Sequence, residues 1–331
     1  MFAAAVRAGA GHVSSEGLAL DSVGFAVPSA DAALALFARV LGGTPQPPRH
    51  DPAEGGAVTH VGFPPGTSVR LVPTGDGGPE VDRGGAGRSG LRDVTLTATE
   101  PERWAARLRA AGVPVRPVAD GAGVEAVPAE LGARLRILAG PTREEASAAA
   151  APGDDGDGAL ARSLDHVCVA VRDLRAAVAV MCDVLGGAVV FGGRSDRMGT
   201  LSAQVRFAAG AKVELLQGVG DASRVTRYVG RYGPGLHHLT FVVRDVRQAV
   251  AAAEAAGFPT VDTMLSGPPH WQETYLRPSR AFGALIQLAW TDLSYSQPLA
   301  PADVEAILAH RVDSSGYRMR PRTPAAAQRS P

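Results

Sequence analysis

Four polar residues stand inside apolar, β-type runs in the second half of the chain. They are His166 in LDHV, Glu214 in KVEL, His238 in GLHHL and Gln287 in LIQL, separated by 48, 24 and 49 residues. Imidazole and carboxylate groups are suitable ligands for Fe(II), Mn, Co, Ni or Zn. A single histidine in an apolar strand is more often a satisfied core residue, so the positions of these residues in the fold must decide their role.

The chain is a tandem repeat. LDHVCVAVRDLRAAVAVMCDVLGG at 164–187 aligns with LDSVGFAVPSADAALALFARVLGG at 20–43, at an offset of 144. Within the second half, AVRDLRAAV at 170–178 corresponds to VVRDVRQAV at 242–250, at an offset of 72. Each half is therefore a pair of similar modules, and this internal repetition sets the organisation of the fold.

Each module is expected to contain one helix and four strands. A short apolar run (HVCVAV or HLTFVV) precedes Asp173 or Asp245, which can cap the amphipathic helix that follows. Three β-type runs then follow the first of these helices: AVVFGG, SAQVRFAAG and AKVELLQ. The sequence predicts an α+β fold of two tandem domains, each built from two β-α-β-β-β modules.

Composition indicates where the domains begin and end. We expect a flexible N-terminus at 1–16, a first domain at 17–140, a polar Gly- and Ala-rich linker at 141–162, a second domain at 163–292, and a C-terminal extension at 293–331. In the extension, PADVEAILAHR at 301–311 is expected to form a short helix before a frayed tail.

Charge and composition exclude several classes of function. Thirty-three basic residues balance thirty-three acidic ones, so we expect no binding to nucleic acid or to a membrane surface. No apolar run reaches the length of a membrane span or signal peptide, and two cysteines, Cys168 and Cys182, are too few for a disulfide framework. We expect a cytoplasmic protein with two buried thiols. No nucleotide-binding fingerprint occurs, so a small-molecule substrate without a nucleotide cofactor is expected.

The paired modules and their phrases resemble the vicinal oxygen chelate superfamily of glyoxalases, bleomycin-resistance proteins and dioxygenases. The resemblance covers nearly the whole chain outside the linker and tails. It implies that two modules form one curved, eight-stranded cup holding a divalent metal, with ligands on the first and last strands of each module. In the second domain these places hold His166, Glu214, His238 and Gln287. Fe(II) is the favoured metal, with Co, Mn, Ni or Zn as alternatives.

The first domain carries different residues at the equivalent places. They are Ser22, Arg70, Asp93 and Arg136. Two arginines facing one cup would repel a dication, so this domain is expected to bind no metal and to act as a scaffold, a homodimerisation surface or a partial lid. The remaining histidines of this half are expected in loops: His12, His50 and His60.

The resemblance leaves the reaction open. The second domain is most similar to methylmalonyl-CoA epimerases, in LDHV, KVELL, GPGLHHLTFVV and YLRPSRAFGALIQLAW. Those enzymes shuttle a proton beside a metal-held carbonyl group, but they carry a glutamate where this chain has Gln287, and an amide accepts no proton at neutral pH. A degenerate first domain before a metal-bearing second domain instead resembles extradiol and 4-hydroxyphenylpyruvate dioxygenases, although these take their carboxylate from the last strand.

We therefore expect a metal-dependent enzyme in which Glu214 and Gln287 take part in catalysis. His166, His238 and Glu214 amount to a 2-His-1-carboxylate set, which favours an Fe(II) oxygenase acting on a small carbonyl or aromatic metabolite. One alternative is an epimerase, isomerase or lyase that works by metal-assisted proton transfer. A second is a metal-free, ligand-sequestering protein of the bleomycin-resistance type.

The segment before the last strand offers candidates for substrate binding. SGPPHWQETYLRPSRAFG at 266–283 is bounded by Pro and Gly and could close over a ligand. Its candidate residues are His270, Gln272, Tyr275 and Arg277, while Trp271 and Tyr275 could instead fill a hydrophobic seam. His237 is expected to point to the opposite sheet face from His238, because side chains alternate along a strand.

Overall fold

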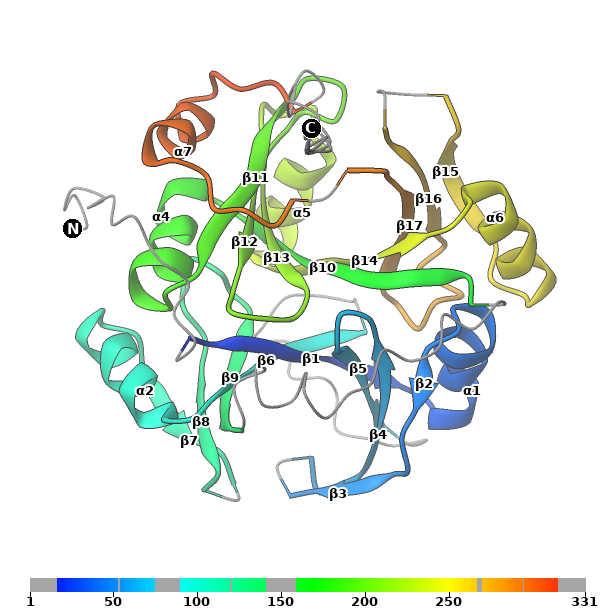
Figure 1. The fold of residues 1–331 in the computed structure, drawn as a ribbon, viewed down its shortest axis with the longest axis horizontal. Coiled ribbons are helices and arrows are strands. Elements are labelled where there is room, and N and C mark those ends of the chain that lie inside the picture. The colour runs from blue at the N-terminus through cyan, green and yellow to red at the C-terminus, as the bar shows by residue number, and fades with distance from the viewer. Residues whose placement is uncertain are drawn as a thin grey trace, which may run out of the picture.

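The computed structural model describes residues 17–52, 54–74, 90–119, 121–140, 159–266, 270–293 and 295–314. The expected flexible N-terminus at 1–16, most of the expected linker at 141–162, His12 and the expected frayed tail beyond residue 314 lie outside the described residues. The two halves of the chain form two mixed sheets, and neither closes into a barrel (Figure 1). The predicted α+β fold of tandem domains is confirmed.

The first sheet has nine strands in the order β2-β4-β5-β1-β6-β9-β8-β7, with β3 paired to β4. The strands are β1 (Ala19–Val27), β2 (Thr44–Pro45), β3 (Arg49–Asp51), β4 (Gly56–Phe63), β5 (Thr67–Pro73), β6 (Leu91–Ala98), β7 (Val115–Pro117), β8 (Gly123–Ala126) and β9 (Arg134–Ala139). Its helices are α1 (Ala30–Leu34), which continues as the π-helix η1 (Ala35–Val40), and α2 (Pro101–Ala110).

The second sheet has eight strands in the order β11-β12-β13-β10-β14-β17-β16-β15. The strands are β10 (Ala161–Val171), β11 (Ala188–Ser195), β12 (Thr200–Arg206), β13 (Lys212–Gly218), β14 (Gly235–Val243), β15 (Thr260–Met264), β16 (Gln272–Leu276) and β17 (Leu285–Trp290). Its helices are α4 (Leu174–Ala179), continued by the π-helix η2 (Val180–Val184), α5 (Arg224–Tyr232), α6 (Val246–Ala255) and α7 (Pro301–Leu308). Because β10 pairs with the parallel β13 and the antiparallel β14, the first strands of the two modules meet at the centre.

The helices begin where the sequence indicates. The side chain of Asp173 accepts a hydrogen bond from the backbone N–H of Ala176, and that of Asp245 accepts one from Gln248. Such N-cap contacts satisfy backbone donors that a helix start leaves unpaired. The two predicted caps therefore fix the direction in which each module's helix leaves its first strand.

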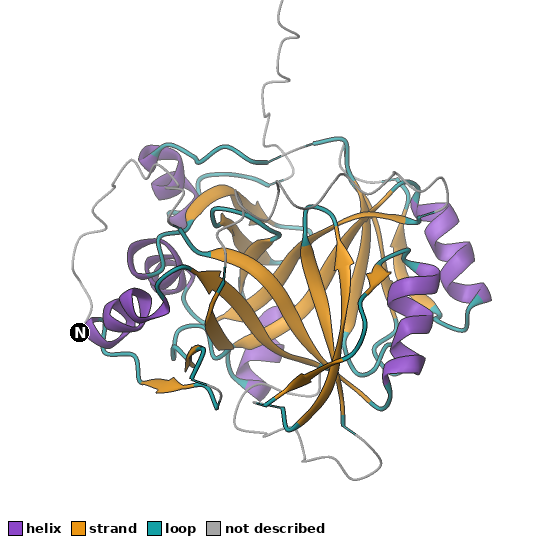
Figure 2. Ribbon diagram, turned by 60° about the horizontal axis from the view of Figure 1, so that its bottom comes forward, coloured by secondary structure: helices purple, strands orange, loops and turns teal. Residues whose placement is uncertain are grey.

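The two domains share one hydrophobic core. Helix α2 of the first domain packs against η2 of the second, and α6 packs against η1 on the other side (Figures 1 and 2). Phe63 and Phe241 meet across the boundary with ring centroids 4.8 Å apart. The backbone N–H of Leu20 donates to the carbonyl oxygen of Ala209 at 2.9 Å. These contacts hold the two sheets in one fixed arrangement.

Among the described helices packed on the second sheet, α5 is the one that was not predicted from the sequence. Its Val225 and Val229 pack against Ala170 and against Leu216. Ala170 lies two residues beyond Cys168 and four beyond His166, so α5 covers part of the face that carries the candidate ligands. This face is therefore partly closed by its own chain.

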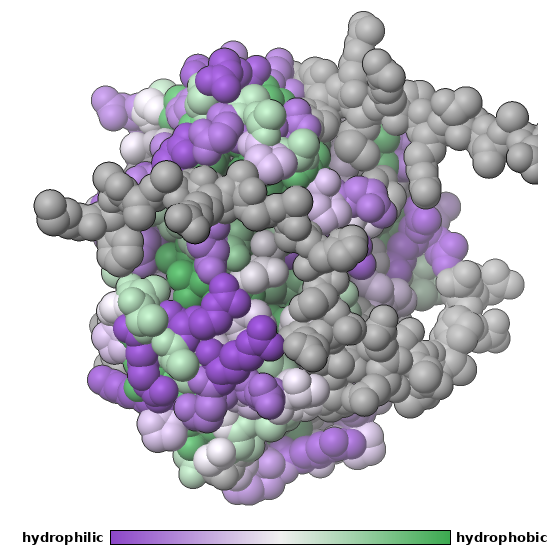
Figure 3. All heavy atoms as spheres, turned by 60° about the vertical axis from the view of Figure 1, so that its left-hand side comes forward, coloured by the Kyte–Doolittle hydropathy of each residue, from purple (hydrophilic) through white to green (hydrophobic). Residues whose placement is uncertain are grey.

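The surface of the described residues is mainly polar. Figure 3 shows hydrophilic side chains over much of the face that carries α2 and α4, with smaller apolar areas between them. Among the described residues, the large hydrophobic side chains classed as exposed are Val127 and Met198. No helix within the described ranges is long and apolar enough to span a membrane.

Candidate metal centre

Three candidate ligands converge because of the strand register. Cys168 on β10 is the register partner of both Glu214 on β13 and His238 on β14, so these two side chains flank β10 on the same face. His166 lies two residues before Cys168 and shares that face. The central position of β10 thus brings together residues that are far apart in the sequence.

The donor atoms of these three residues surround one point. Oε2 of Glu214 lies 3.5 Å from Nε2 of His166 and 3.6 Å from Nε2 of His238, and the ligand atoms of all three lie within 4.8 Å of one another. Donors at about 2.0–2.3 Å from one metal lie roughly 3–3.5 Å apart. Both histidines are buried. Two imidazoles and a carboxylate in this arrangement fit a divalent metal ion.

His166 is held in place by two charged neighbours. Its Nδ1 lies 2.7 Å from Oδ2 of Asp165, and Nζ of Lys212 lies 2.8 Å from Oδ1 of the same carboxylate. Burial would lower the pKa of His166, but the hydrogen bonds with Asp165 and Glu214 outweigh burial and raise it to about 9. Nε2 therefore points at Glu214, as expected for a histidine ligand whose other nitrogen is fixed by a carboxylate.

Glu214 and His238 have the ionisation states that a ligand needs. Burial opposes the ionisation of Glu214, but the hydrogen bond and charge of His166, with the charge of His238, lower its pKa to about 2. Burial, followed by the charge of His237, lowers the pKa of His238 well below its usual value. A carboxylate and a neutral imidazole are therefore present at neutral pH.

His237 lies on the same side as His238, so the prediction that it points to the opposite face is wrong. A register shift between Cys168 and Val169 places a bulge in β14 opposite these residues. A bulge redirects side chains that regular alternation would send to the other face. Nδ1 of His237 lies 2.9 Å from Nδ1 of His238, and its ring meets the Tyr228 ring of α5 edge-on at 4.8 Å. His237 thus orients His238.

The two cysteines have different surroundings. Cys168 is buried beside Glu214 and, with His237 and His238, forms a second group of potential ligand atoms. Burial raises the pKa of the Cys168 thiol well above its usual value, and the charge of Glu214 adds to that effect. Cys182 on η2 is only half-buried, contrary to the expectation of two buried thiols. The protonated Cys168 therefore acts as a hydrogen-bonding neighbour of Glu214.

The hydroxyl group of Thr240 connects Gln287 to the ligand candidate His166. Thr240 is the register partner of both His166 and Gln287. Its Oγ1 donates to Oε1 of Gln287 at 2.7 Å and lies 2.9 Å from Nε2 of His166. The carbonyl end of the Gln287 amide therefore faces the centre, and its role as a ligand stays a prediction.

Comparison with known proteins identifies a family model for part of the chain. Residues 165–274 match the family model described as the Glyoxalase/Bleomycin resistance protein/Dioxygenase superfamily. Within the second half of the chain, residues 165–274 are thus similar to this superfamily. The resemblance stated from the sequence is thereby confirmed, and none of the curated proteins matches the chain significantly.

Several solved structures are similar to part or most of this chain. The methylmalonyl-CoA epimerase from Mycobacterium tuberculosis is 28% identical, with a TM-score of 0.36, over 39% of this chain and 88% of that one. A variant of the Streptomyces coelicolor methylmalonyl-CoA epimerase, in complex with 2-nitronate-propionyl-CoA, is 24% identical, with a TM-score of 0.37, over 40% and 99%. A mutant of 4-hydroxymandelate synthase from Streptomyces coelicolor is 14% identical, with a TM-score of 0.59, over 88% and 97%. The last shows that the fold of both halves together is shared.

One residue of the superfamily domain's centre was missed in the sequence. Glu273 on β16 is buried, and its Oε2 accepts hydrogen bonds from Nε2 of Gln287 at 2.7 Å and from Nε1 of Trp271 at 2.8 Å. Nε2 of Gln287 also donates to the hydroxyl oxygen of Tyr275 at 2.9 Å. The signal was available, because Glu273 lies two residues before Tyr275 and so shares its face of the strand.

The substrate candidates divide into two groups. Tyr275 lies beside Gln287, whereas His270 pairs with Asp292 at the surface, with Nδ1 to Oδ2 at 2.8 Å. Gln272 shares the opposite face of β16 with Thr274, and Arg277 is exposed beyond the end of that strand. The structure therefore brings only Tyr275 of these four to the centre of the superfamily domain.

The first domain's cup is filled by ion pairs. The four residues at the places equivalent to the candidate ligands are all buried: Ser22, Arg70, Asp93 and Arg136. Arg70 NH1 lies 2.9 Å from Oε1 of Glu54, and Arg136 NH1 lies 3.4 Å from Oδ2 of Asp51. The arginines thus have carboxylate partners from the turn that closes this cup. His50 and His60 lie on β3 and β4, contrary to the expectation of loops.

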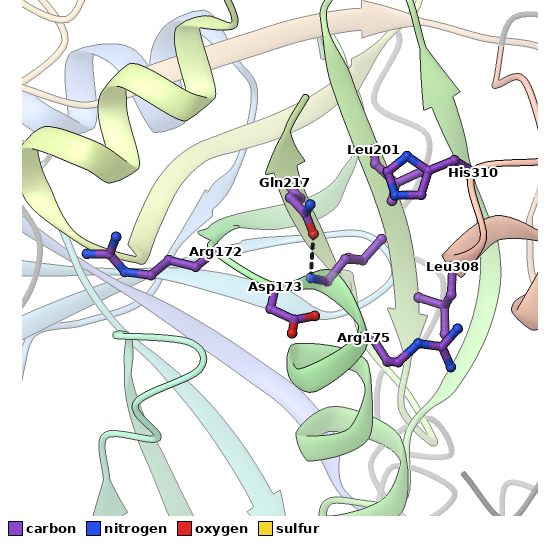
Figure 4. Close-up of a pocket in the computed structure, with 8 residues that line it drawn as sticks. Arg172, Asp173, Arg175, Leu201, Gln217, Leu308 and His310 are labelled. Atoms are coloured by element: carbon purple, nitrogen blue, oxygen red, sulfur yellow. Dashed lines mark hydrogen bonds between the residues drawn. The ribbon is translucent and has the colours of Figure 1, made fainter. Parts of the chain in front are cut away.

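A depression of about 400 Å³ lies elsewhere, between the start of α4 and the end of α7 (Figure 4). Oε1 of Gln217 accepts a hydrogen bond there from the backbone N–H of Leu174 at 2.7 Å, and Arg175 is paired with Glu305. The Arg172 side chain points away from the other labelled residues (Figure 4). Gln217 and Arg175 are thus already paired, and Arg172 points away. None of the residues that line the depression belongs to the candidate centre.

Proposed function

We propose that this protein is a divalent-metal enzyme for a small-molecule substrate, with Fe(II) oxygenase chemistry favoured. The observation that carries the proposal is the convergence of two imidazoles and one carboxylate, from His166, His238 and Glu214, on one buried point. Gln287 beside them is neutral, so the donor set has a single anionic ligand. This is the composition of a 2-His-1-carboxylate site.

The surrounding residues make the set rigid. Asp165 and Lys212 fix the ring of His166, and His237 fixes that of His238. Fixed donors lose little conformational entropy when they bind a metal. Fe(II) in such a set supplies open coordination positions for a substrate and dioxygen. Helix α5 and the buried strands around the centre exclude bulk water from one side.

A second candidate function is metal-assisted proton transfer by an epimerase, isomerase or lyase. It is supported by Glu273 and Tyr275, which place a carboxylate and a phenol beside Gln287. A positioned carboxylate can accept a proton from carbon acids. Oε2 of Glu273, however, already accepts hydrogen bonds from Trp271, Gln287 and Tyr275, so its acceptor sites are occupied by protein donors.

The two candidates are tested together on the full chain. The protein is purified without oxygen, its metal is analysed, and Fe(II)- and Zn-loaded samples are screened for oxygen uptake with 2-oxo acids, catechols and acyl-CoAs. Oxygen uptake that requires both Fe(II) and one substrate class would support the oxygenase. Proton exchange by the Zn-loaded protein without oxygen uptake would favour the second candidate. Failure to bind any divalent metal would contradict both.

A further inference from the structure

The amide of Gln287 is held at both of its ends. Its Oε1 accepts a hydrogen bond from Oγ1 of Thr240 at 2.7 Å, on the side of the candidate ligands. Its Nε2 donates to Oε2 of Glu273 at 2.7 Å and to the hydroxyl oxygen of Tyr275 at 2.9 Å, on the opposite side. The amide therefore lies between a donor and a group of acceptors.

Glu273 determines which end of the amide faces the centre. An ionised carboxylate only accepts hydrogen bonds, whereas an amide has one end that accepts and one that donates. A reversed Gln287 would place its carbonyl oxygen against Oε2 of Glu273, two acceptors with no proton between them. The hydroxyl of Tyr275 donates to Glu273 at 3.3 Å, which leaves its oxygen free to accept from Gln287. These hydrogen bonds are therefore consistent with only one orientation of the Gln287 amide.

Glu273 is itself fixed and charge-balanced. Arg197 NH2 lies 3.1 Å from its Oε1, and Nε1 of Trp271 donates to its Oε2 at 2.8 Å. Its side chain is only 6% exposed, whereas that of Arg197 is 52% exposed. A buried carboxylate with these partners is held in one orientation. The Glu273 carboxylate is therefore suited to orienting a neighbouring side chain rather than to binding substrate.

We propose that Glu273 is a positioning residue that presents the carbonyl oxygen of Gln287 to the metal. This inference rests on the proposed metal centre. Among the described residues, Glu273 belongs to neither group of potential metal ligands. It acts through Gln287, because a fixed carbonyl oxygen is a donor for a divalent metal and a reversed NH2 group is not.

The test measures Co(II) binding to the full-length, metal-free protein. Titration gives the affinity, and visible absorption reports on the ligands around Co(II). Glu273→Gln keeps the shape of the side chain but offers both a donor and an acceptor, so it no longer fixes the direction of Gln287. We expect Co(II) affinity to fall about 10- to 100-fold. The visible bands should also change in intensity, because a ligand is lost. Gln287→Ala should give the same loss, and Glu273→Gln should add nothing in the Gln287→Ala background.

Two further variants keep the test decisive. Glu254→Gln, at an exposed glutamate bonded to Thr260, is the matched control and should leave Co(II) binding unchanged. If Glu273→Gln does not fold, Tyr275→Phe is measured in its place. Tyr275→Phe should lower Co(II) affinity by a smaller factor, and it should have no effect in a protein that already carries Gln287→Ala. Unchanged Co(II) binding in Glu273→Gln, or losses that simply add, would overturn the inference. Full Co(II) binding by His238→Ala would instead overturn the proposed metal centre.

Discussion

Arg70 and Asp93 form a buried ion pair at the places that Glu214 and His238 take in the second domain. NH2 of Arg70 lies 2.9 Å from Oδ1 and 2.7 Å from Oδ2 of Asp93. Gly24 is the register partner of both residues, as Cys168 is of Glu214 and His238. A Cβ atom at Gly24 would lie 2.6 Å from Asp93. Equivalent strand positions thus hold candidate metal ligands in the second domain and an ion pair in the first.

The first prediction concerns the stability of this pair. Asp93→Ala leaves NH2 of the buried Arg70 without its carboxylate partner, so the free energy of unfolding in urea should fall by about 3 kcal/mol or more. Replacing both residues, with Arg70→Met and Asp93→Leu, should cost less than Asp93→Ala alone. Metal content should be unchanged in both proteins. A loss below about 1 kcal/mol for Asp93→Ala would show that Glu54 and Asp51, the other carboxylates paired with Arg70, compensate its charge.

The parts of the fold that were predictable depend on repeated or local signals. The tandem arrangement follows from the offset of 144, and the caps at Asp173 and Asp245 are contacts between residues three apart. Helix α5 was missed although Val225, Tyr228, Val229 and Tyr232 recur at helical spacing, because it lies outside the repeated β-α-β-β-β pattern from which the helices were predicted. A helix of nine residues is also short, and such helices depend on tertiary packing.

The site was only partly predictable for a different reason. His166, Glu214 and His238 stand at equivalent places of the repeat, so their convergence could be expected. The side of His237 depends on a bulge, and the partnership of Glu273 with Gln287 depends on how β16 pairs with β17. Register and bulges are set by packing of the whole sheet.

The second prediction tests the ligands directly. His238→Ala removes one of the three donors and should abolish stoichiometric metal binding without unfolding the protein, as measured by metal analysis and circular dichroism. His270→Ala is the matched control, because that histidine pairs with Asp292 at the surface. It should keep full metal content. Retention of metal by His238→Ala would show that the ligand assignment is wrong.

The third prediction concerns the pH dependence of metal uptake. Below a pH of about 9, His166 carries a second proton in the metal-free protein, because its pKa is raised to about 9. A metal must displace that proton, so affinity should rise about tenfold per pH unit between about pH 6 and 8. Glu214, with its pKa lowered to about 2, stays ionised throughout. Calorimetry in buffers of different ionisation enthalpy should show about one proton released per metal.

Asp165→Asn provides the control for this pH dependence. The substitution removes the carboxylate whose hydrogen bond contributes most to raising the pKa of His166. Proton release near pH 8 should therefore fall below that of the unaltered protein. Equal proton release from both proteins would mean that another group loses the proton.

The last prediction separates the two candidate functions and depends on Gln287. Gln287→Glu places a second carboxylate within contact of Glu273, whose Oε2 now lies 2.7 Å from Nε2 of Gln287. Two carboxylates this close cannot both stay ionised at ordinary cost, so the pair shares a proton. In an oxygenase, a carboxylate in place of the neutral amide would add a second anionic donor beside the metal, and oxygen consumption should fall. In a proton-transfer enzyme, the restored acid should raise deuterium uptake into an acyl-CoA or a 2-oxo acid.

We expect lower oxygen consumption, because the neutral Gln287 leaves the donor set with a single anionic ligand. Gln217→Glu is the matched control, since Gln217 accepts from the backbone N–H of Leu174 away from the centre and a carboxylate can accept the same bond. That variant should behave like the unaltered protein in both assays. Deuterium exchange by the unaltered protein without oxygen, with Zn or Mg bound, would reverse this expectation. The carboxylate of Glu273 would then be the base that the last strand lacks.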